Sequence, residues 1–146
     1  MKISPTAQAE NDAQAKLALH LPFGLIGLRH LTHFELEPPE EGMPFQVLRA
    51  LGDELYEFVV VDPNTLLDGY TCVLRDEDAD SLRITSVEDA LLLNIVAIHS
   101  HEPQHVTVNL VGPIVVNRAT LMGQQVILAN SADWSTEHVL VDQRPG

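Results

Sequence analysis

Three histidines and a glutamate within seven positions are the residues of this chain best suited to chemistry. They form the sequence His99-Ser100-His101-Glu102-Pro103-Gln104-His105. Imidazole nitrogens bind zinc, and on a strand His99 and His101 lie on one face, as two ligands of one ion must. With Glu102 beside them as a general base, the pattern indicates a metal-dependent hydrolase.

The sequence around this cluster favours a different interpretation. Pro103 introduces a turn, so the place of His105 depends on loop geometry, and no second group of ligands or paired cysteines completes a tetrahedral zinc site. The same residue types are typical of a solvent-exposed turn. We therefore expect a polar hairpin tip that binds no metal. The hydrolase, with His99, His101 and His105 as ligands, stays open as the alternative function.

Other catalytic patterns are weak or absent in the sequence. No G-x-S-x-G motif marks a serine nucleophile, and the single Cys72 lies in a strand-like run, which favours a core residue over a reactive thiol. Gly24 and Gly27 lack the third glycine, the lysine and the βαβ context of a phosphate-binding loop. We expect these glycines to mark turns with positive φ, and we predict no enzymatic activity and no cofactor.

The charge of the chain is strongly acidic. Eight Lys and Arg residues stand against 21 Asp and Glu, which gives a formal net charge of −13. A field of this sign repels the phosphates of nucleic acid and speeds the encounter with a basic protein. We expect no direct binding of nucleic acid.

The densest acidic patch is the candidate partner-binding site. It consists of Asp76, Glu77, Asp78, Asp80, Glu88 and Asp89. The alternative is that Asp76, Glu77, Asp78 and Asp80 only form the solvated face of a helix. The positive end of the helix dipole favours acidic side chains near the helix N-terminus. The strand amides Asn109 and Asn117 are the second candidate, since they offer hydrogen bonds but no nucleophile, base or metal ligand.

Short apolar runs, separated by turn residues about every ten positions, position these side chains. They occur at residues 17–21, 31–36, 45–51, 56–61, 70–74, 106–116 and 123–128. This spacing predicts a mainly β fold, a small antiparallel β-barrel-like or sandwich domain. Short helical turns are expected at 76–82 and after Ser86, whose spacing to Asp89 fits a capping box.

The domain limits follow from composition. A chain of 146 residues is the size of one domain, and we place that domain at residues 16–140. Residues 1–15 are small and polar and are expected to form a loosely attached arm, and residues 141–146 a short tail.

The apolar runs are too short for a membrane span, the N-terminus lacks the apolar core of a signal peptide, and a lone cysteine forms no internal disulfide. We expect a cytoplasmic protein without a membrane partner.

Two strands allow burial to be predicted by residue. Val108, Leu110, Ile114 and Val116 should be buried, while Thr107 belongs to the polar side of a half-buried strand. Asn109 and Asn117 should form hydrogen bonds at strand ends or face a partner. In the run 58–61, alternate side chains should lie on opposite faces of a sheet, and Pro63 should prevent the strand from continuing.

Four segments, taken in order, resemble the flagellar assembly factor FliW family. They are Leu21-Pro22-Phe23-Gly24-Leu25-Ile26-Gly27-Leu28, Phe58-Val59-Val60-Val61-Asp62-Pro63, Thr107-Val108-Asn109-Leu110 with Pro113-Ile114-Val115-Val116-Asn117, and Gly123-Gln124-Gln125-Val126-Ile127-Leu128. The resemblance covers residues 16 to about 140 and includes the capped turn at Ser86. The N-terminal arm, the tip at 99–105 and the tail depart from the family pattern.

The resemblance implies a cytoplasmic β-barrel-like regulator with two alternative protein partners, flagellin and the translational repressor CsrA. In this family, unassembled flagellin holds the factor. After flagellin export, the freed factor binds the repressor, and flagellin mRNA is translated. The charge of −13 agrees with a basic, RNA-binding partner. We expect the free protein to be a monomer.

Overall fold

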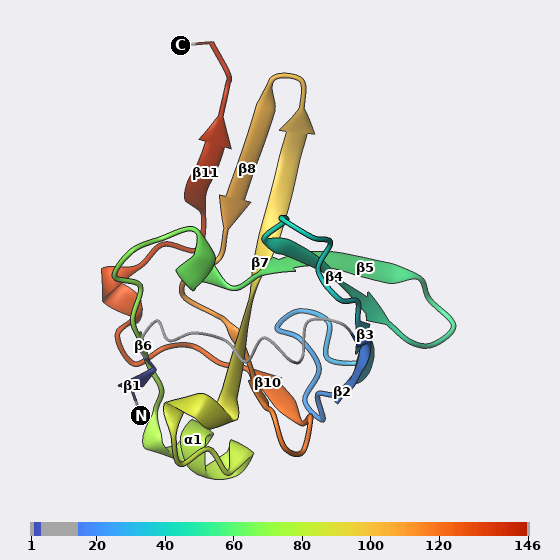
Figure 1. The fold of residues 1–146 in the computed structure, drawn as a ribbon, viewed down its shortest axis with the longest axis vertical. Helices are drawn as coiled ribbons and strands as arrows, with labels where there is room; N and C mark the ends of the chain where they lie inside the picture. The colour runs from blue at the N-terminus through green and yellow to red at the C-terminus, as the bar shows by residue number, and fades with distance from the viewer. Residues whose placement is uncertain (1, 4–14, 146) are drawn as a thin grey trace.

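The computed structural model describes residues 2–3 and 15–145 and consists mainly of antiparallel strands (Figure 1). The strands are β1 (Lys2–Ile3), β2 (Leu17–His20), β3 (His33–Leu36), β4 (Phe45–Ala50), β5 (Tyr56–Val61), β6 (Cys72–Val73), β7 (Ala90–His101), β8 (Gln104–Val108), β9 (Ile114–Asn117), β10 (Gly123–Gln125) and β11 (His138–Asp142). One helix, α1 (Asp76–Leu82), and the 3₁₀ turns Pro63–Thr65, Val87–Asp89 and Ser131–Asp133 lie between them. The expected fold class and both expected helical turns are confirmed.

The main sheet curls on itself without closing. Its strands follow the order β10-β9-β7-β5-β4-β3-β2, and β8 continues it from β7 to β11. The two ends meet only at an isolated bridge between His20 and Met122, where the His20 N–H donates to the Leu121 carbonyl over 3.0 Å. The sheet is therefore barrel-like but open, since no ladder joins β2 to β10.

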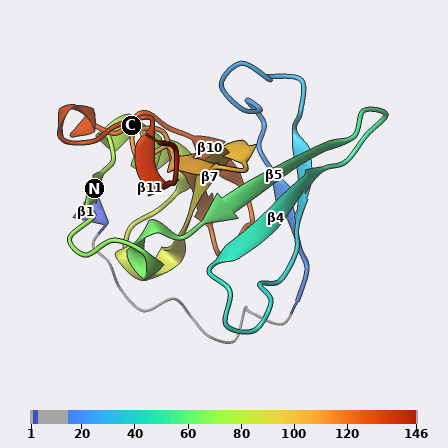
Figure 2. The same cartoon turned by 90° about the horizontal axis from the view of Figure 1, so that it is seen from above.

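The long strand β7 connects the two parts of the molecule. Residues 90–93 pair with β9, residues 94–96 with β5, and residues 96–101 with β8. In Figure 1 the β7–β8 hairpin and β11 extend away from the rest of the sheet, and α1 lies at the opposite end of β7. Figure 2 shows β4 and β5 as a twisted pair that runs away from β7.

The sheet separates two hydrophobic cores. The first surrounds Tyr70 and Cys72, and the second surrounds Phe34 and Leu21. As expected, alternate residues of β5 contribute to opposite cores: Val61 belongs to the first and Val60 to the second. The predicted burial of Val108, Leu110, Ile114 and Val116 is also confirmed, with exposed fractions of 0–1%.

Thr107 does not follow the predicted alternation. It is only 3% exposed, although it was expected on the solvent side of its strand. The His99 ring, on the neighbouring strand β7, lies 2.9 Å from its hydroxyl through Nε2. The hydroxyl is thus satisfied without water, which allows a polar residue to be buried in the middle of the ladder.

Between β8 and β9 the chain leaves the ladder at residues 109–113. The excursion is held by hydrogen bonds at its start: the Asn94 amide donates to the Asn109 carbonyl over 2.8 Å, and the Tyr70 hydroxyl donates to the Leu110 carbonyl over 2.7 Å. The Asn109 side chain accepts from the backbone N–H of Val111 and of Gly112, both at 3.0 Å. The expectation that Asn109 hydrogen-bonds at a strand end is confirmed.

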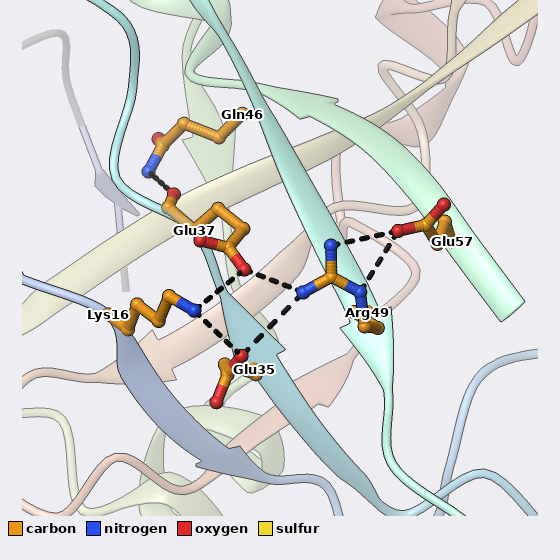
Figure 3. A network of polar contacts seen from close by, with 6 residues as sticks. All are labelled: Lys16, Glu35, Glu37, Gln46, Arg49 and Glu57. Carbon is orange, nitrogen blue, oxygen red and sulfur yellow. Dashed lines mark hydrogen bonds and ion pairs between the residues drawn. The ribbon is translucent and has the colours of Figure 1, made fainter. Parts of the chain in front are cut away.

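A charged network crosses the outer face of β2–β5 (Figure 3). Arg49 donates to the carboxylate of Glu37 at 2.6 Å and to that of Glu57 at 2.9 Å, and lies 3.6 Å from Glu35. Lys16 lies within 3.7 Å of both Glu35 and Glu37. The Arg49 hydrogen bond holds the pKa of Glu37 below its usual value, so this carboxylate keeps its charge in acid better than an isolated glutamate does.

The predicted ends of the chain are described only in part. Residues 4–14 of the expected arm lie outside the described residues, while Lys2–Ile3 form β1 and pair with β6. At the other end, β11 runs to Asp142, two residues into the expected tail. No helix in the described ranges is long and apolar enough to cross a membrane.

Candidate protein-binding surface

The histidine cluster forms a hairpin tip, as its composition indicates. β7 ends at His101 and β8 begins at Gln104, so Glu102 and Pro103 make the turn. The rings of His99 and His105 stack with centroids 4.6 Å apart, and His101 is exposed. Within residues 2–3 and 15–145, no three His, Cys, Asp or Glu side chains are grouped to hold a metal ion. The geometry therefore gives the hydrolase alternative no support.

Cys72 is a core residue, as predicted. It is fully buried in the first core, and burial raises the pKa of its thiol to about 11. Because the thiolate is the reactive form, this side chain is unreactive near neutral pH.

The acidic patch lies on α1 and on the 3₁₀ turn that leads into β7. Asp76, Glu77 and Asp80 are exposed on α1, whereas Asp78 is half-buried. Burial, followed by the charge of Glu77, raises the pKa of Asp78. The carboxylates most exposed to solvent on this helix are therefore those of Asp76, Glu77 and Asp80.

Glu88 and Asp89, the acids of the patch that follow α1, are hydrogen-bonded to the residues just before them. The Glu88 carboxylate accepts a short hydrogen bond from the Ser86 hydroxyl, and the Ser86 oxygen in turn accepts from the Glu88 N–H. Asp89 is half-buried and accepts from Thr85 over 3.3 Å. Of this pair, Glu88 is the acid that presents its side chain to solvent.

Asn117, the other predicted amide, is a positioning residue. It is 5% exposed, and its Nδ2 donates to the carbonyls of Leu82 at 2.9 Å and Arg83 at 3.3 Å. Its Oδ1 accepts from the N–H of Ala119 at 2.8 Å and Thr120 at 3.2 Å. One side chain thus fixes the end of α1 to the turn between β9 and β10.

The end of α1 and the turn between β9 and β10 form walls of a surface groove that the sequence did not predict. The groove consists of two adjoining hollows of about 390 and 360 Å³ that share Phe23 and Gln124. It is bordered by the loop 22–29, by the end of α1 and by the segment 120–127. We call it the apolar groove, after its exposed side chains Phe23, Ile26, Met122 and Ile127.

The loop 22–29 depends on its two glycines. Gly24 and Gly27 have φ of +65° and +87°, as predicted. A Cβ on Gly24 would lie 2.5 Å from the Arg29 carbonyl oxygen, because the loop folds back onto its own backbone there. Leu25 and Leu28 exchange two backbone hydrogen bonds across the turn. Together these contacts set Phe23 and Ile26 at the mouth of the groove.

Comparison with known proteins indicates one family. A family model described as FliW protein matches residues 2–140, which extends beyond the 16–140 covered by the motif resemblance. The flagellar assembly factor FliW of Natranaerobius thermophilus is 28% identical over 144 residues, covering 99% of this chain and 95% of that protein. The FliW of Thermotoga neapolitana is 34% identical over 120 residues, covering 82% and 80%. A crystal structure of the flagellar assembly factor FliW matches with a TM-score of 0.75 at 26% identity, covering 97% of this chain and 98% of that one.

Proposed function

The chain belongs to the FliW family, and from this premise we propose that it binds flagellin and, when free of flagellin, the translational repressor CsrA. In this scheme the chain acts in the cytoplasm as a flagellar assembly factor. It releases flagellin mRNA from repression by binding the repressor and makes no contact with RNA. The observation that carries the proposal is the family match over residues 2–140.

The surface chemistry supports a role in binding proteins. The exposed acids Asp76, Glu77, Asp80 and Glu88 lie on α1 and its following turn, at the end of the molecule where β7 begins (Figure 1). An RNA-binding repressor carries cations for phosphate contacts, and these cations are attracted by a partner with a net charge of −13. We place the repressor on this acidic patch.

Displacement of one partner by the other tests the proposal. We expect purified chain to raise the fluorescence anisotropy of labelled repressor, and an excess of monomeric flagellin to return the anisotropy to its starting value. The chain alone should not bind labelled flagellin mRNA. Repressor that does not bind would show that it is not a partner. Repressor that stays bound at saturating flagellin would show that the two partners are not alternatives.

Charge reversal in the acidic patch should slow the association with the repressor. For the triple variant Glu77→Lys, Asp80→Lys, Glu88→Lys we expect an association rate several-fold lower at low salt. The difference should shrink near 0.5 M salt, where the Debye length is roughly 4 Å. Stopped-flow association across a salt series measures both effects.

A matched control separates the patch from net charge. The variant Glu40→Lys, Glu41→Lys, Asp53→Lys makes the same change in charge at exposed positions of the β3–β4 and β4–β5 connections. It should associate faster than the patch variant at low salt. Equal rates for the two triple variants would show that the patch is only a solvated helix face.

A further inference from the structure

We propose that the apolar groove is the docking site for a protein segment that presents apolar side chains next to a carboxylate, and that flagellin supplies this segment. The inference rests on the proposed function in one respect, namely that flagellin is a partner. It adds the site and the chemistry of recognition. Three observations carry it: exposed apolar side chains, a local reversal of charge, and backbone strain at the walls of the groove.

Apolar side chains are concentrated at the groove. Phe23 is 59% exposed, Ile26 52%, Met122 40% and Ile127 40%. These are four of the ten large hydrophobic side chains exposed in the described ranges, and all four line the two adjoining hollows. Exposed apolar side chains gathered in one groove are typical of an interaction site.

The charge at the groove is opposite to that of the molecule. Among the described residues, no Asp or Glu lines either hollow, although the chain has 21 acids, and two guanidinium groups, Arg29 and Arg83, do. Arg49 and Arg144 are paired with carboxylates at 2.6–2.9 Å. Arg29 and Arg83 have no carboxylate within ion-pair distance in the described part of the chain, so both can bind an incoming one.

Backbone strain points to Arg83 in particular. Arg83 ends α1 with φ +56° and ψ +39°, in the left-handed conformation. The Ile84 N–H bonds to the Ala79 carbonyl, and the Arg83 N–H to that of Asp80, which is the Schellman arrangement that favours glycine at this position. An arginine held there against the backbone preference indicates that its side chain is needed.

A second residue with left-handed backbone lies at the other wall of the larger hollow. Leu121, with φ +60°, is the other non-glycine residue of positive φ in the described ranges, and it lies between two residues that line the hollow, Thr120 and Met122. Asn117 fixes both strained segments through its four hydrogen bonds. The walls are therefore preorganised, which lowers the cost of ordering them when a partner binds.

Charge selects between the two proposed partners. The repressor is basic where it binds RNA, and the guanidinium groups of Arg29 and Arg83 disfavour such a surface. Flagellin is therefore the occupant that the groove favours. The acidic patch and Arg83 share α1, so a protein seated in the groove lies beside the patch, which explains how one partner can exclude the other.

Two groove variants and one control test the inference, with purified flagellin and purified repressor as the probes. For Phe23→Ser and for Arg83→Gly we expect the dissociation constant for flagellin to rise about tenfold, the effect of losing one anchor side chain. The constant for the repressor should not rise for either variant, because neither substitution removes an acid of the patch. Leu55→Ser removes an 80% exposed leucine at the β4–β5 turn and should leave both constants unchanged.

Two further measurements exclude a folding effect. Glycine prefers the backbone conformation of Arg83, so Arg83→Gly should unfold at a temperature no lower than the wild type. Arg83→Lys keeps the charge and should recover part of the lost affinity. Equal affinity of flagellin for wild type and both groove variants would overturn the inference, as would an equal loss of both partners. If wild type binds no flagellin at all, the proposed function itself is wrong and the inference fails with it.

Discussion

Asn117→Ala should unfold about 10 °C below the wild-type protein. Its amide makes four hydrogen bonds at a site that is 5% exposed, so alanine leaves two carbonyls and two N–H groups without their partner. At about 1 kcal/mol or somewhat less for each lost bond, the free energy of unfolding falls by about 3 kcal/mol. In a domain of this size that corresponds to roughly 10 °C, which calorimetry measures directly.

The same variant should lose affinity for flagellin, because both walls of the apolar groove lose their common fixing point. Asn130→Ala is the matched control: its side chain accepts from the Val73 N–H at 3.0 Å and donates to the Thr71 carbonyl at 2.9 Å, beside β6 rather than at the groove. It should lower stability but retain flagellin binding. If both variants bind flagellin equally well, Asn117 stabilises the fold without shaping the groove.

The strands of the second core show how much of the fold is readable from the sequence. Val60 lies between Val59 and Val61, and alternation alone assigns it to the opposite face, where it meets the second core at 0% exposure. α1 is equally readable, since its buried Ala79 and Leu82 stand three apart among acids. In such segments local pattern and tertiary packing require the same residue types.

Burial of a polar residue is not readable in this way. Thr107 has the residue type of a solvent-facing strand position, and only the pairing of β7 with β8 brings His99 within 2.9 Å of its hydroxyl. The strand pattern reports which side chains are apolar, but not which polar ones find a partner inside the protein.

The apolar groove was missed for a related reason. Phe23 and Met122 are far apart in sequence and become neighbours only because the curled sheet brings β2 to the start of β10. An apolar residue type alone does not tell an exposed anchor from a core residue. A usable signal was present, since Phe23 stands between Pro22 and Gly24 in a turn, where side chains point outward.

Gly24→Ala should destabilise the protein far more than Gly27→Ala, although both glycines lie in one turn with positive φ. At Gly24 a Cβ would lie 2.5–2.6 Å from three backbone atoms of Arg29, and backbone cannot rotate away as a side chain can. At Gly27 a Cβ meets nothing within 4 Å. We expect a loss of about 3 kcal/mol at Gly24 and about 1 kcal/mol or less at Gly27, where only the left-handed conformation is penalised.

Urea unfolding followed by the fluorescence of the single Trp134 measures both values. The pair also tests the groove, because relief of the contact with Arg29 must move the loop that carries Phe23 and Ile26. Gly24→Ala should therefore bind flagellin more weakly under conditions where it is fully folded, while Gly27→Ala binds as the wild type does. Equal destabilisation by the two substitutions would mean that conformational preference alone sets the cost, and that the close approach of the loop to Arg29 is not kept in solution.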